Sequence, residues 1–265
     1  MPRIGVFDSG VGGLTVLKEL VALVPAAEYL YFGDTARLPY GSKSVETVAK
    51  YAVSSAKFLQ THGIDLLVVA CNTATALAFD RIVHSVTVPV IGVVEPGARR
   101  AQAATRNQYA VVIGTEATVS SHAYQRALAA RGLTVREKAC PLLVPLVEEG
   151  WTEHAITEQV ARIYLHEAFS DGFCKADVLL LGCTHYPLLR PLLRRLVPAE
   201  VTIVDSAEST AHAVAEKLEV AGSKVETRNT KLHFFATDSV EKFRRLGERF
   251  LGCRIENVQH VDIDV

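Results

Sequence analysis

The sequence predicts an α/β protein made of two similar halves, each a parallel-rich sheet flanked by helices. Three observations lead to this fold class. Apolar, β-branched runs of four to six residues recur along the chain, as expected for strands buried on both faces of a parallel sheet. Segments with helical spacing separate these runs. Similar strand-and-loop pairs then return at offsets of about 110 residues, which indicates an internal duplication.

The candidate strands follow one another along the whole chain. Each is rich in Val, Ile, Leu, Tyr or Phe, and most are continuously apolar. They cover residues 4–7, 29–32, 65–70, 88–93, 109–113, 134–139, 178–181, 201–204 and 232–235.

The clearest predicted helix covers residues 44–62. Ser44 is a candidate N-cap, and Gly63 is a candidate C-terminal stop. The apolar positions fall near the i, i+3, i+4, i+7 spacing of a half-buried helix. These positions are Val45, Val48, Ala49, Ala52, Ala56 and Leu59.

The duplication is visible in three pairs of segments. Strand LLVVA runs into Cys71 and strand VLLLG runs into Cys183, while IGVFDSG resembles VIGTEAT and VIGVVEP resembles TIVDSAES. The similarity of any one pair could arise because buried strands of parallel sheets generally have similar sequences. Three pairs in the same order at similar offsets favour two related α/β domains.

Composition excludes several classes of protein. The 265 residues carry 28 Lys and Arg against 29 Asp and Glu, so charge gives no case for a nucleic-acid or anionic-membrane partner. No secretory h-region and no run of 18 apolar residues is present, so neither secretion nor a membrane span is expected. The five cysteines include no C-x-x-C pair, which argues against a disulfide framework or structural zinc and favours reduced thiols in the cytoplasm.

The ligand site is expected beyond the carboxyl ends of the strands. The glycines of DSGVGG match neither G-x-G-x-x-G nor a P-loop, so we interpret them as a tight turn with permissive backbone. The strand-end set contains no Lys or Arg, which disfavours a phosphate-rich ligand. It comprises Asp8 and Ser9, Gly33 and Asp34, Cys71 to Thr73, Glu95, Thr115 to Thr118, Cys183 to His185, and Asp205 and Ser206.

Two cysteines stand apart from the other three. Cys140, Cys174 and Cys253 are interpreted as small buried hydrophobic residues. Cys71 and Cys183 each end an apolar strand, where helix N-terminal amides are expected to lower a thiol pKa. Thiols in equivalent loops would face one another across the cleft between the halves. Removal of a proton from one face of a carbon and delivery to the other is racemisation.

Two neighbouring residues have alternative interpretations. His185 lies two positions from Cys183 and is either its acid/base assistant or a hydrogen-bonded structural histidine. Asp8 is either an assistant to Cys71 or the residue of an Asx turn or N-cap before the first helix.

Seven segments, in this order, resemble the signature segments of bacterial glutamate racemases, and the resemblance covers nearly the whole chain. The segments are FDSGVGGLTVL, YFGDTARLPYG, ACNTATALA, IGVVEPG, CPLLVPLVEEG, LLLGCTHYPLL and VDSAEST. The resemblance implies a cytoplasmic, cofactor-independent homodimer without a metal, which interconverts L- and D-glutamate to supply peptidoglycan synthesis. It also implies two pseudo-symmetric domains, residues 1–96 with 208–265 and residues 97–207, with the active site between them.

The resemblance also implies residue roles. Cys71 and Cys183 become the two catalytic acid/bases, Asp8 the partner of Cys71, and Glu148 and His185 the partners of Cys183. Glu149 is adjacent, and Glu148 is chosen because it completes the family-like PLVE. The short stretch before the first strand implies activity without a cell-wall precursor as activator. The implied substrate contacts are Asp8, Ser9, Tyr40, Gly41, Asn72, Thr73, Thr115, Thr118, Thr184 and His185.

Three alternatives remain at this point. Aspartate and hydantoin racemases of the same superfamily also use paired cysteines, although YFGDTARLPYG and CTHYPL favour glutamate. A non-catalytic binding protein with a vestigial site is a second class. A thiol redox or metal protein is a third, disfavoured by the lack of a C-x-x-C pair.

Overall fold

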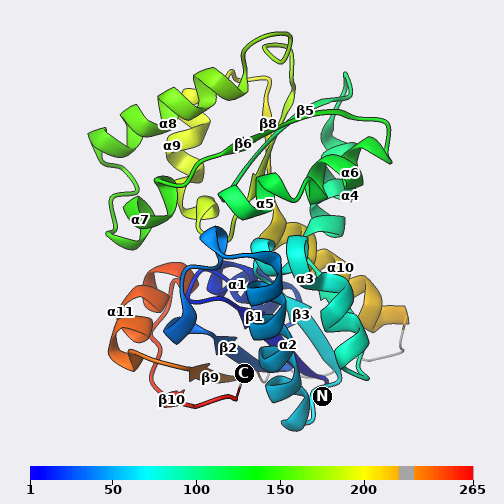
Figure 1. Cartoon of the computed structure of the whole chain (residues 1–265), viewed down its shortest axis with the longest axis vertical. Helices are drawn as coiled ribbons and strands as arrows, with labels where there is room; N and C mark the ends of the chain where they lie inside the picture. Colours follow the sequence, from blue (N-terminus) through cyan, green and yellow to red (C-terminus); the bar gives the residue numbers. More distant parts are fainter. Residues whose placement is uncertain (221–229, 265) are drawn as a thin grey trace.

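Two parallel sheets form the framework of the protein. In the computed structural model, which describes residues 1–220 and 230–264, the first sheet has the strand order β10-β9-β2-β1-β3-β4 and the second β6-β5-β7-β8. Figure 1 shows the second sheet and its helices above the first. The expected α/β class, with helices flanking parallel sheets, is confirmed.

The first sheet and its helices take up the beginning and the end of the chain. Its strands are β1 (Arg3–Asp8), β2 (Glu28–Gly33), β3 (Leu66–Val69), β4 (Val90–Gly92), β9 (Lys231–Ala236) and β10 (Val258–His260). The associated helices are α1 (Leu14–Leu23), the 3₁₀ turns η1 (Thr35–Arg37) and η2 (Tyr40–Ser42), α2 (Val45–Thr61), α3 (Asn72–Ser85), α10 (Ser206–Val220) and α11 (Val240–Leu251).

The second sheet and its helices take up the middle of the chain. Its strands are β5 (Tyr109–Gly114), β6 (Thr134–Ala139), β7 (Val178–Gly182) and β8 (Thr202–Asp205). The associated helices are α4 (Val94–Ala104), α5 (Glu116–Ser120), α6 (Ala123–Ala129), α7 (Leu143–Glu148), α8 (Ala155–Ala168), the 3₁₀ turn η3 (Tyr186–Leu189) and α9 (Arg190–Leu196).

The two halves repeat one topology. The order β2-β1-β3-β4 in the first sheet has the same form as β6-β5-β7-β8 in the second, and all these neighbours pair in parallel. The three segment pairs found in the sequence correspond to β1 with β5, β3 with β7, and β4 with β8. The loops after β3 and β7, which carry Cys71 and Cys183, are therefore equivalent by topology.

Two helices cross between the halves. Helix α4 leaves the first sheet after β4 and packs on β7, β8 and α6, whereas α10 leaves the second sheet after β8 and packs on α1. One continuous apolar cluster extends from α1 to the strands of the second sheet and helices α8 and α9. The predicted domain boundaries at residues 96/97 and 207/208 fall at these two helices, and they remain a prediction.

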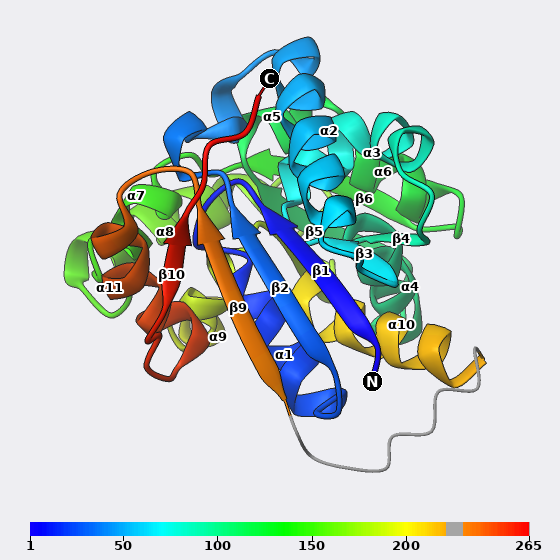
Figure 2. The same cartoon turned by 90° about the horizontal axis from the view of Figure 1, so that it is seen from below.

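Local sequence signals account for most elements. Helix α2 begins after Ser44, whose side chain accepts a hydrogen bond from the Thr47 amide, and it is followed by Gly63 with φ 70°. Its expected apolar positions are buried except for Val45, which is 42% exposed. Strand β10 was not predicted, since its three residues are largely exposed and pair only with β9 at the sheet edge (Figure 2).

The glycines after β1 have a different purpose from the one expected. None of Gly10, Gly12 and Gly13 adopts a positive φ, so the interpretation as permissive backbone is wrong. A Cβ on Gly12 would lie 2.2 Å from Thr184 Oγ1, and one on Gly13 would lie 2.5 Å from Asp8 Cβ. The missing side chains permit close approach of other residues, and at Gly12 these come from the second half.

The cysteine environments divide differently from the expectation. Cys140 is buried as predicted, but Cys174 and Cys253 are exposed, so the interpretation of these two as buried hydrophobic residues is wrong. Cys174 lies in the turn between α8 and β7, and Cys253 follows Gly252, the left-handed cap that ends α11. Among helices within the described ranges, none combines the length and apolar character needed to cross a membrane.

Candidate active site

A cavity of about 400 Å³ lies between the two halves and collects most of the predicted site residues. Its walls come from the carboxyl ends of strands in both sheets, as expected for parallel sheets. Of the residues with roles implied by the resemblance, Asp8 and Thr118 do not line it. Several members of the predicted strand-end set also lie outside it, namely Gly33, Asp34, Glu95, Ala117, Asp205 and Ser206. The lining residues are Ser9, Leu38, Pro39, Tyr40, Gly41, Ser42, Cys71, Asn72, Thr73, Thr115, Glu116, Pro141, Val144, Pro145, Glu148, Cys183, Thr184, His185 and Lys242.

Cys71 reaches the cavity from the first half. It is the N-cap of α3, where its Sγ accepts a hydrogen bond from the Ala74 amide at 3.4 Å and lies 3.5 Å from Ser9 Oγ. Burial, followed by the nearby Asp8 carboxylate, raises the pKa of the Cys71 thiol to about 12. The expectation of a lowered pKa is therefore wrong for Cys71, because the helix amides do not offset these two effects.

Asp8 lies behind the cavity wall at the end of β1. Its Oδ2 accepts a hydrogen bond from the Gly10 amide at 2.8 Å, which is the Asx turn of the sequence alternatives, while the N-cap of α1 is Gly13. Its Oδ1 is buried with no hydrogen-bond partner among the described residues. Burial raises the pKa of the Asp8 carboxyl. The unpartnered Oδ1 is a buried acceptor without a donor, and the Asp8 carboxylate is close enough to Cys71 to raise the pKa of that thiol.

Cys183 reaches the cavity from the second half, next to a histidine and a glutamate. His185 Nδ1 lies 4.0 Å from Cys183 Sγ, and His185 Nε2 lies 3.2 Å from Glu148 Oε1. The neighbouring Glu149 side chain is exposed. Burial by itself lowers the pKa of His185, but the contacts with Cys183 and Glu148 outweigh it and raise the pKa to about 10. The imidazolium is thus favoured at neutral pH, and it lowers the pKa of Glu148.

Three threonine hydroxyls form a ring that joins the two halves. Thr73 Oγ1 lies 3.0 Å from Thr115 Oγ1 and 3.2 Å from Thr118 Oγ1, and the last two are 2.9 Å apart. Next to Thr73, Asn72 is held by Tyr124, whose hydroxyl donates to Asn72 Oδ1 at 2.6 Å. Hydroxyl groups can turn to donate to an incoming carboxylate, so this wall suits an anionic group.

Tyr40 and Gly41 form another part of the cavity wall. The Tyr40 hydroxyl donates to Asp34 Oδ2 at 2.6 Å, and burial, together with Asp34, raises the pKa of Tyr40, so it remains a donor. A Cβ on Gly41 would lie 2.9 Å from Thr115 Cβ. The first half therefore approaches the second closely at this point too.

Some cavity residues were missed by reasoning from the sequence. Leu38, Pro39 and Ser42 adjoin predicted residues and could have been found from the same segment. Lys242 on α11 could not, because no strand end or motif near it signals a site. It also corrects the expectation of a site without Lys or Arg. Among the described residues, no group of three His, Cys, Asp or Glu side chains is placed to hold a metal ion.

The raised pKa of His185 predicts a pH-dependent stability. A histidine whose pKa rises on folding contributes stability that is complete below its unfolded value of 6.5 and is lost as the pH rises to about 10. We expect His185→Asn to be less stable than the wild type by about 3 kcal/mol at pH 6, and by much less at pH 10. Urea unfolding at several pH values measures this difference. The exposed His84 provides the control variant His84→Asn. If the loss of unfolding free energy in His185→Asn were the same at every pH, the raised pKa of His185 would be contradicted.

The chain is similar to proteins of one family. The sequence model described as Asp/Glu/Hydantoin racemase matches residues 4–214. The glutamate racemase of Koribacter versatilis (strain Ellin345) is 57% identical, and the alignment covers 99% of this chain and 98% of that protein.

Solved structures give the same similarity. A glutamate racemase isoform from Bacillus anthracis superposes with a TM-score of 0.93 at 40% identity, over 98% of this chain and 97% of that one. The glutamate racemase from Francisella tularensis, crystallised with D-glutamate, gives a TM-score of 0.91 at 34% identity, again over 98% and 97%.

Proposed function

The chain belongs to the Asp/Glu/Hydantoin racemase family, and on that premise we propose that it interconverts L- and D-glutamate. The observation that carries the proposal is the placement of Cys71 and Cys183, which come from equivalent loops of two related halves and line one cavity. A substrate α-carbon between them would present one face to each thiol. Glutamate as the substrate is supported by relatives that are named glutamate racemase and align with nearly the whole chain.

The proposed chemistry transfers one proton in and one proton out. The thiolate of one cysteine removes the α-proton, and the thiol of the other donates a proton to the opposite face of the carbanion. Each turnover thus leaves the two cysteines with exchanged protonation states, ready for the reverse direction. No electron acceptor is needed, because the carbon is neither oxidised nor reduced.

The two cysteines are proposed to start in different states. The raised pKa of Cys71 favours its thiol form, which makes it the proton donor of the first turnover. Cys183, whose Sγ lies 4.0 Å from Nδ1 of the His185 imidazolium, is proposed as the base of the first turnover. Glu148 holds that imidazolium from the other side. His185 and Glu148 therefore support Cys183 without touching the α-carbon.

The carbanion needs stabilisation beyond a well-placed base. The α-proton of an amino acid is much less acidic than a thiol, so charge that develops on the α-carboxylate must be met by preorganised donors. Thr73 and Thr115, held by Thr118 behind them, supply such donors, and Asn72 and Thr184 supply others from the cavity wall. Ser9, which lines the cavity, is proposed to receive the substrate ammonium, and the buried Asp8 carboxylate behind this wall would favour that positive charge without contacting it.

The wider role is proposed from the resemblance to bacterial glutamate racemases. The D-glutamate formed would supply peptidoglycan for the cell wall, and the enzyme would act as a homodimer. The cytoplasm is the proposed location, since unpaired thiols such as these persist in a reducing compartment.

The direct test follows the circular dichroism signal of glutamate. With no cofactor and no activator added, L-glutamate is expected to lose its signal completely as the racemate forms, and D-glutamate to give the same end point. L-aspartate and a hydantoin serve as alternative substrates and are expected to turn over at least about 100-fold more slowly, as for a misfitted substrate. Faster turnover of L-aspartate than of L-glutamate would make aspartate the substrate of the enzyme. No turnover of any of the three compounds would favour a non-catalytic binding protein.

A further inference from the structure

A buried carboxylate outside the cavity connects the cavity wall to the C-terminal part of the chain. Asp34 follows β2 and is fully buried (0% exposed), and its side chain does not line the cavity. Its backbone amide donates to the Asp8 carbonyl at 3.1 Å.

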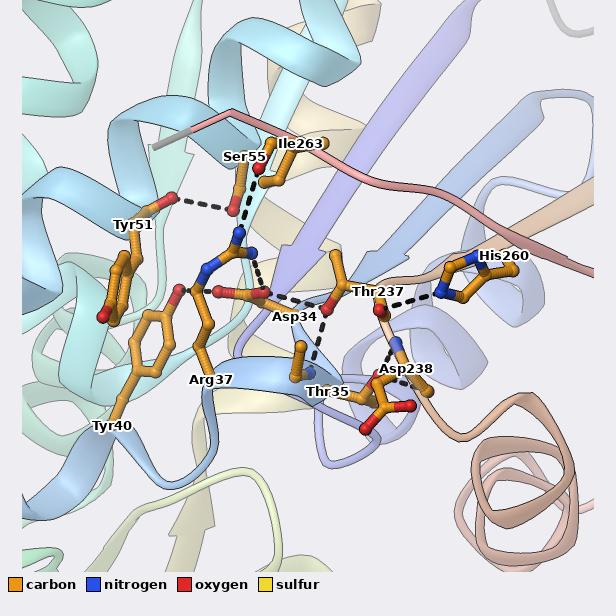
Figure 3. A network of polar contacts seen from close by, with 11 residues as sticks. Asp34, Thr35, Arg37, Tyr40, Tyr51, Ser55, Thr237, Asp238, His260 and Ile263 are labelled. Carbon is orange, nitrogen blue, oxygen red and sulfur yellow. Dashed lines mark hydrogen bonds and ion pairs between the residues drawn. The ribbon is translucent and has the colours of Figure 1, made fainter.

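Three side chains donate hydrogen bonds to the Asp34 carboxylate (Figure 3). The Tyr40 hydroxyl donates to Oδ2 at 2.6 Å, Arg37 Nη1 donates to Oδ1 at 2.7 Å, and Thr237 Oγ1 donates to Oδ1 at 3.0 Å. A buried charge with several donors is costly to disturb, because any donor removed leaves part of the charge unsatisfied. The arrangement therefore fixes Tyr40, Arg37 and Thr237 relative to one another.

Thr237 joins this carboxylate to the end of β9. Besides donating to Asp34, its Oγ1 accepts a hydrogen bond from the Ala36 amide at 2.9 Å. Asp238 continues the connection, since its amide donates to Thr35 Oγ1 at 2.8 Å and its carbonyl accepts from the same hydroxyl at 2.6 Å. The segment between β2 and the cavity is thus bonded to residues about 200 positions later, a non-local contact.

Arg37 joins the same carboxylate to residues 261–264, which we name the C-terminal tail. Arg37 Nη2 donates to the Ile263 carbonyl at 2.9 Å. The tail is held in turn by the Val261 amide, which donates to the Ala236 carbonyl at 3.0 Å, and by packing of Val261 and Ile263 on an apolar cluster that includes Tyr40. Figure 2 shows the tail running from β10 toward the beginning of α2.

Residues 38–42, which we name the cavity loop, depend on this network. All five line the cavity, and Tyr40 is the one fixed by Asp34. Tyr40 also packs on Tyr51, with ring centroids 6.0 Å apart, and Tyr51 carries the Arg37 guanidinium 5.4 Å above its ring. The cysteines are placed by other elements, β3 and β7, so a shift of the cavity loop would leave them in position.

On the basis of the proposed racemisation, we propose that Asp34 is a positioning residue, which holds the cavity loop against Thr237 and the C-terminal tail and so sets the affinity for glutamate. Asp34 acts through Tyr40 and does not contact the substrate. None of the described residues after Lys242 lines the cavity, yet through this network residues 261–264 control the shape of its wall.

The experiment weakens the network at Thr237, which lies outside the cavity. Thr237→Val keeps the shape of the side chain but removes the hydroxyl that bridges Asp34 and the Ala36 amide. We expect the KM for glutamate to rise about tenfold, as for the loss of one buried hydrogen bond, with kcat within about twofold of the wild type. Thr237→Ser keeps the hydroxyl and is expected to retain the wild-type KM. Arg37→Met, which removes the link to the tail, is expected to raise the KM in the same way.

A matched control separates positioning from general destabilisation. Thr105 also donates to a carboxylate, Asp177 Oδ1 at 2.7 Å, next to the amino end of β7 and away from the cavity. Thr105→Val is expected to lower the unfolding temperature without changing KM. An unchanged KM in both Thr237→Val and Arg37→Met would overturn the proposal, as would a fall of kcat with no change in KM.

Amide hydrogen exchange tests the positioning of the cavity loop without relying on enzyme turnover. Amide exchange of the cavity loop is expected to accelerate in Thr237→Val and to stay at the wild-type rate in Thr105→Val. If the wild type does not racemise glutamate, the proposed function fails, while this comparison still tests the positioning of the loop. Exchange in the loop that is the same in both variants would overturn the positioning.

Discussion

Removal of either cavity cysteine is expected to stop racemisation while leaving half of the chemistry intact. In Cys71→Ala the starting base Cys183 remains but no thiol protonates the opposite face, and in Cys183→Ala the reverse holds. We expect kcat for racemisation to fall by at least about 10³-fold in each variant, within the range for a lost general acid or base. Circular dichroism with L- and D-glutamate measures this loss.

A glutamate analogue with a leaving group on the β-carbon then distinguishes the two thiols. Removal of the α-proton by the remaining cysteine expels the leaving group and needs no proton on the opposite face. Each variant is therefore expected to eliminate from one enantiomer only, and the two variants from opposite enantiomers. Cys140→Ala is the matched control, since Cys140 is buried but does not line the cavity, and it should retain kcat within about twofold. Full racemisation by Cys71→Ala or Cys183→Ala would exclude a two-cysteine mechanism.

The second large effect is expected at Gly12, which does not line the cavity. An added Cβ would lie 2.2 Å from Thr184 Oγ1 and 2.6 Å from His185 Nδ1, so both side chains must move. Since His185 supports Cys183, we expect Gly12→Ala to lower kcat/KM by about 100-fold and stability by about 2 kcal/mol, typical of overpacking. Steady-state kinetics and urea unfolding measure the two effects.

Two further variants test the cause of this loss. Gly97→Ala is the control, because its added Cβ would meet the nearest atom, Tyr124 Cε1, at an ordinary 3.4 Å, and helix α4 should be stabilised slightly. Thr184→Ala in the Gly12→Ala background removes the closest clash and should restore part of the stability but not the activity. If Gly12→Ala were as stable and active as Gly97→Ala, the close approach of the two halves at this point would not matter.

The elements of the fold follow from local patterns because each strand is a short apolar run between helix signals. All nine predicted strands are present, and Ser44 caps α2 as expected. Strand β10 escaped prediction because a short, exposed edge strand has no apolar pattern and exists through its pairing with β9. The strand predicted over residues 88–93 is longer than the observed β4, which covers Val90–Gly92.

The candidate site was also predictable where its residues follow strands. Parallel strands bring their carboxyl ends together, so the loops with Cys71 and Cys183 could be expected in one cavity. The pKa of Cys71 could not be predicted, because the helix amides were visible in the sequence but the burial was not. Lys242 escaped for a similar reason, since only the packing of α11 brings it to the cavity.

The sequence by itself determined the class of fold, the duplication, the pair of thiols and the resemblance to one family. These depend on residues close together in the chain or on patterns repeated along it. The tertiary structure decided what depends on distance: the contact of Gly12 with Thr184 and His185, and the links from Asp34 to Thr237 and from Arg37 to Ile263. Such contacts join residues separated by up to 226 positions. No local pattern encodes them, because only the packing of the complete chain brings these atoms together.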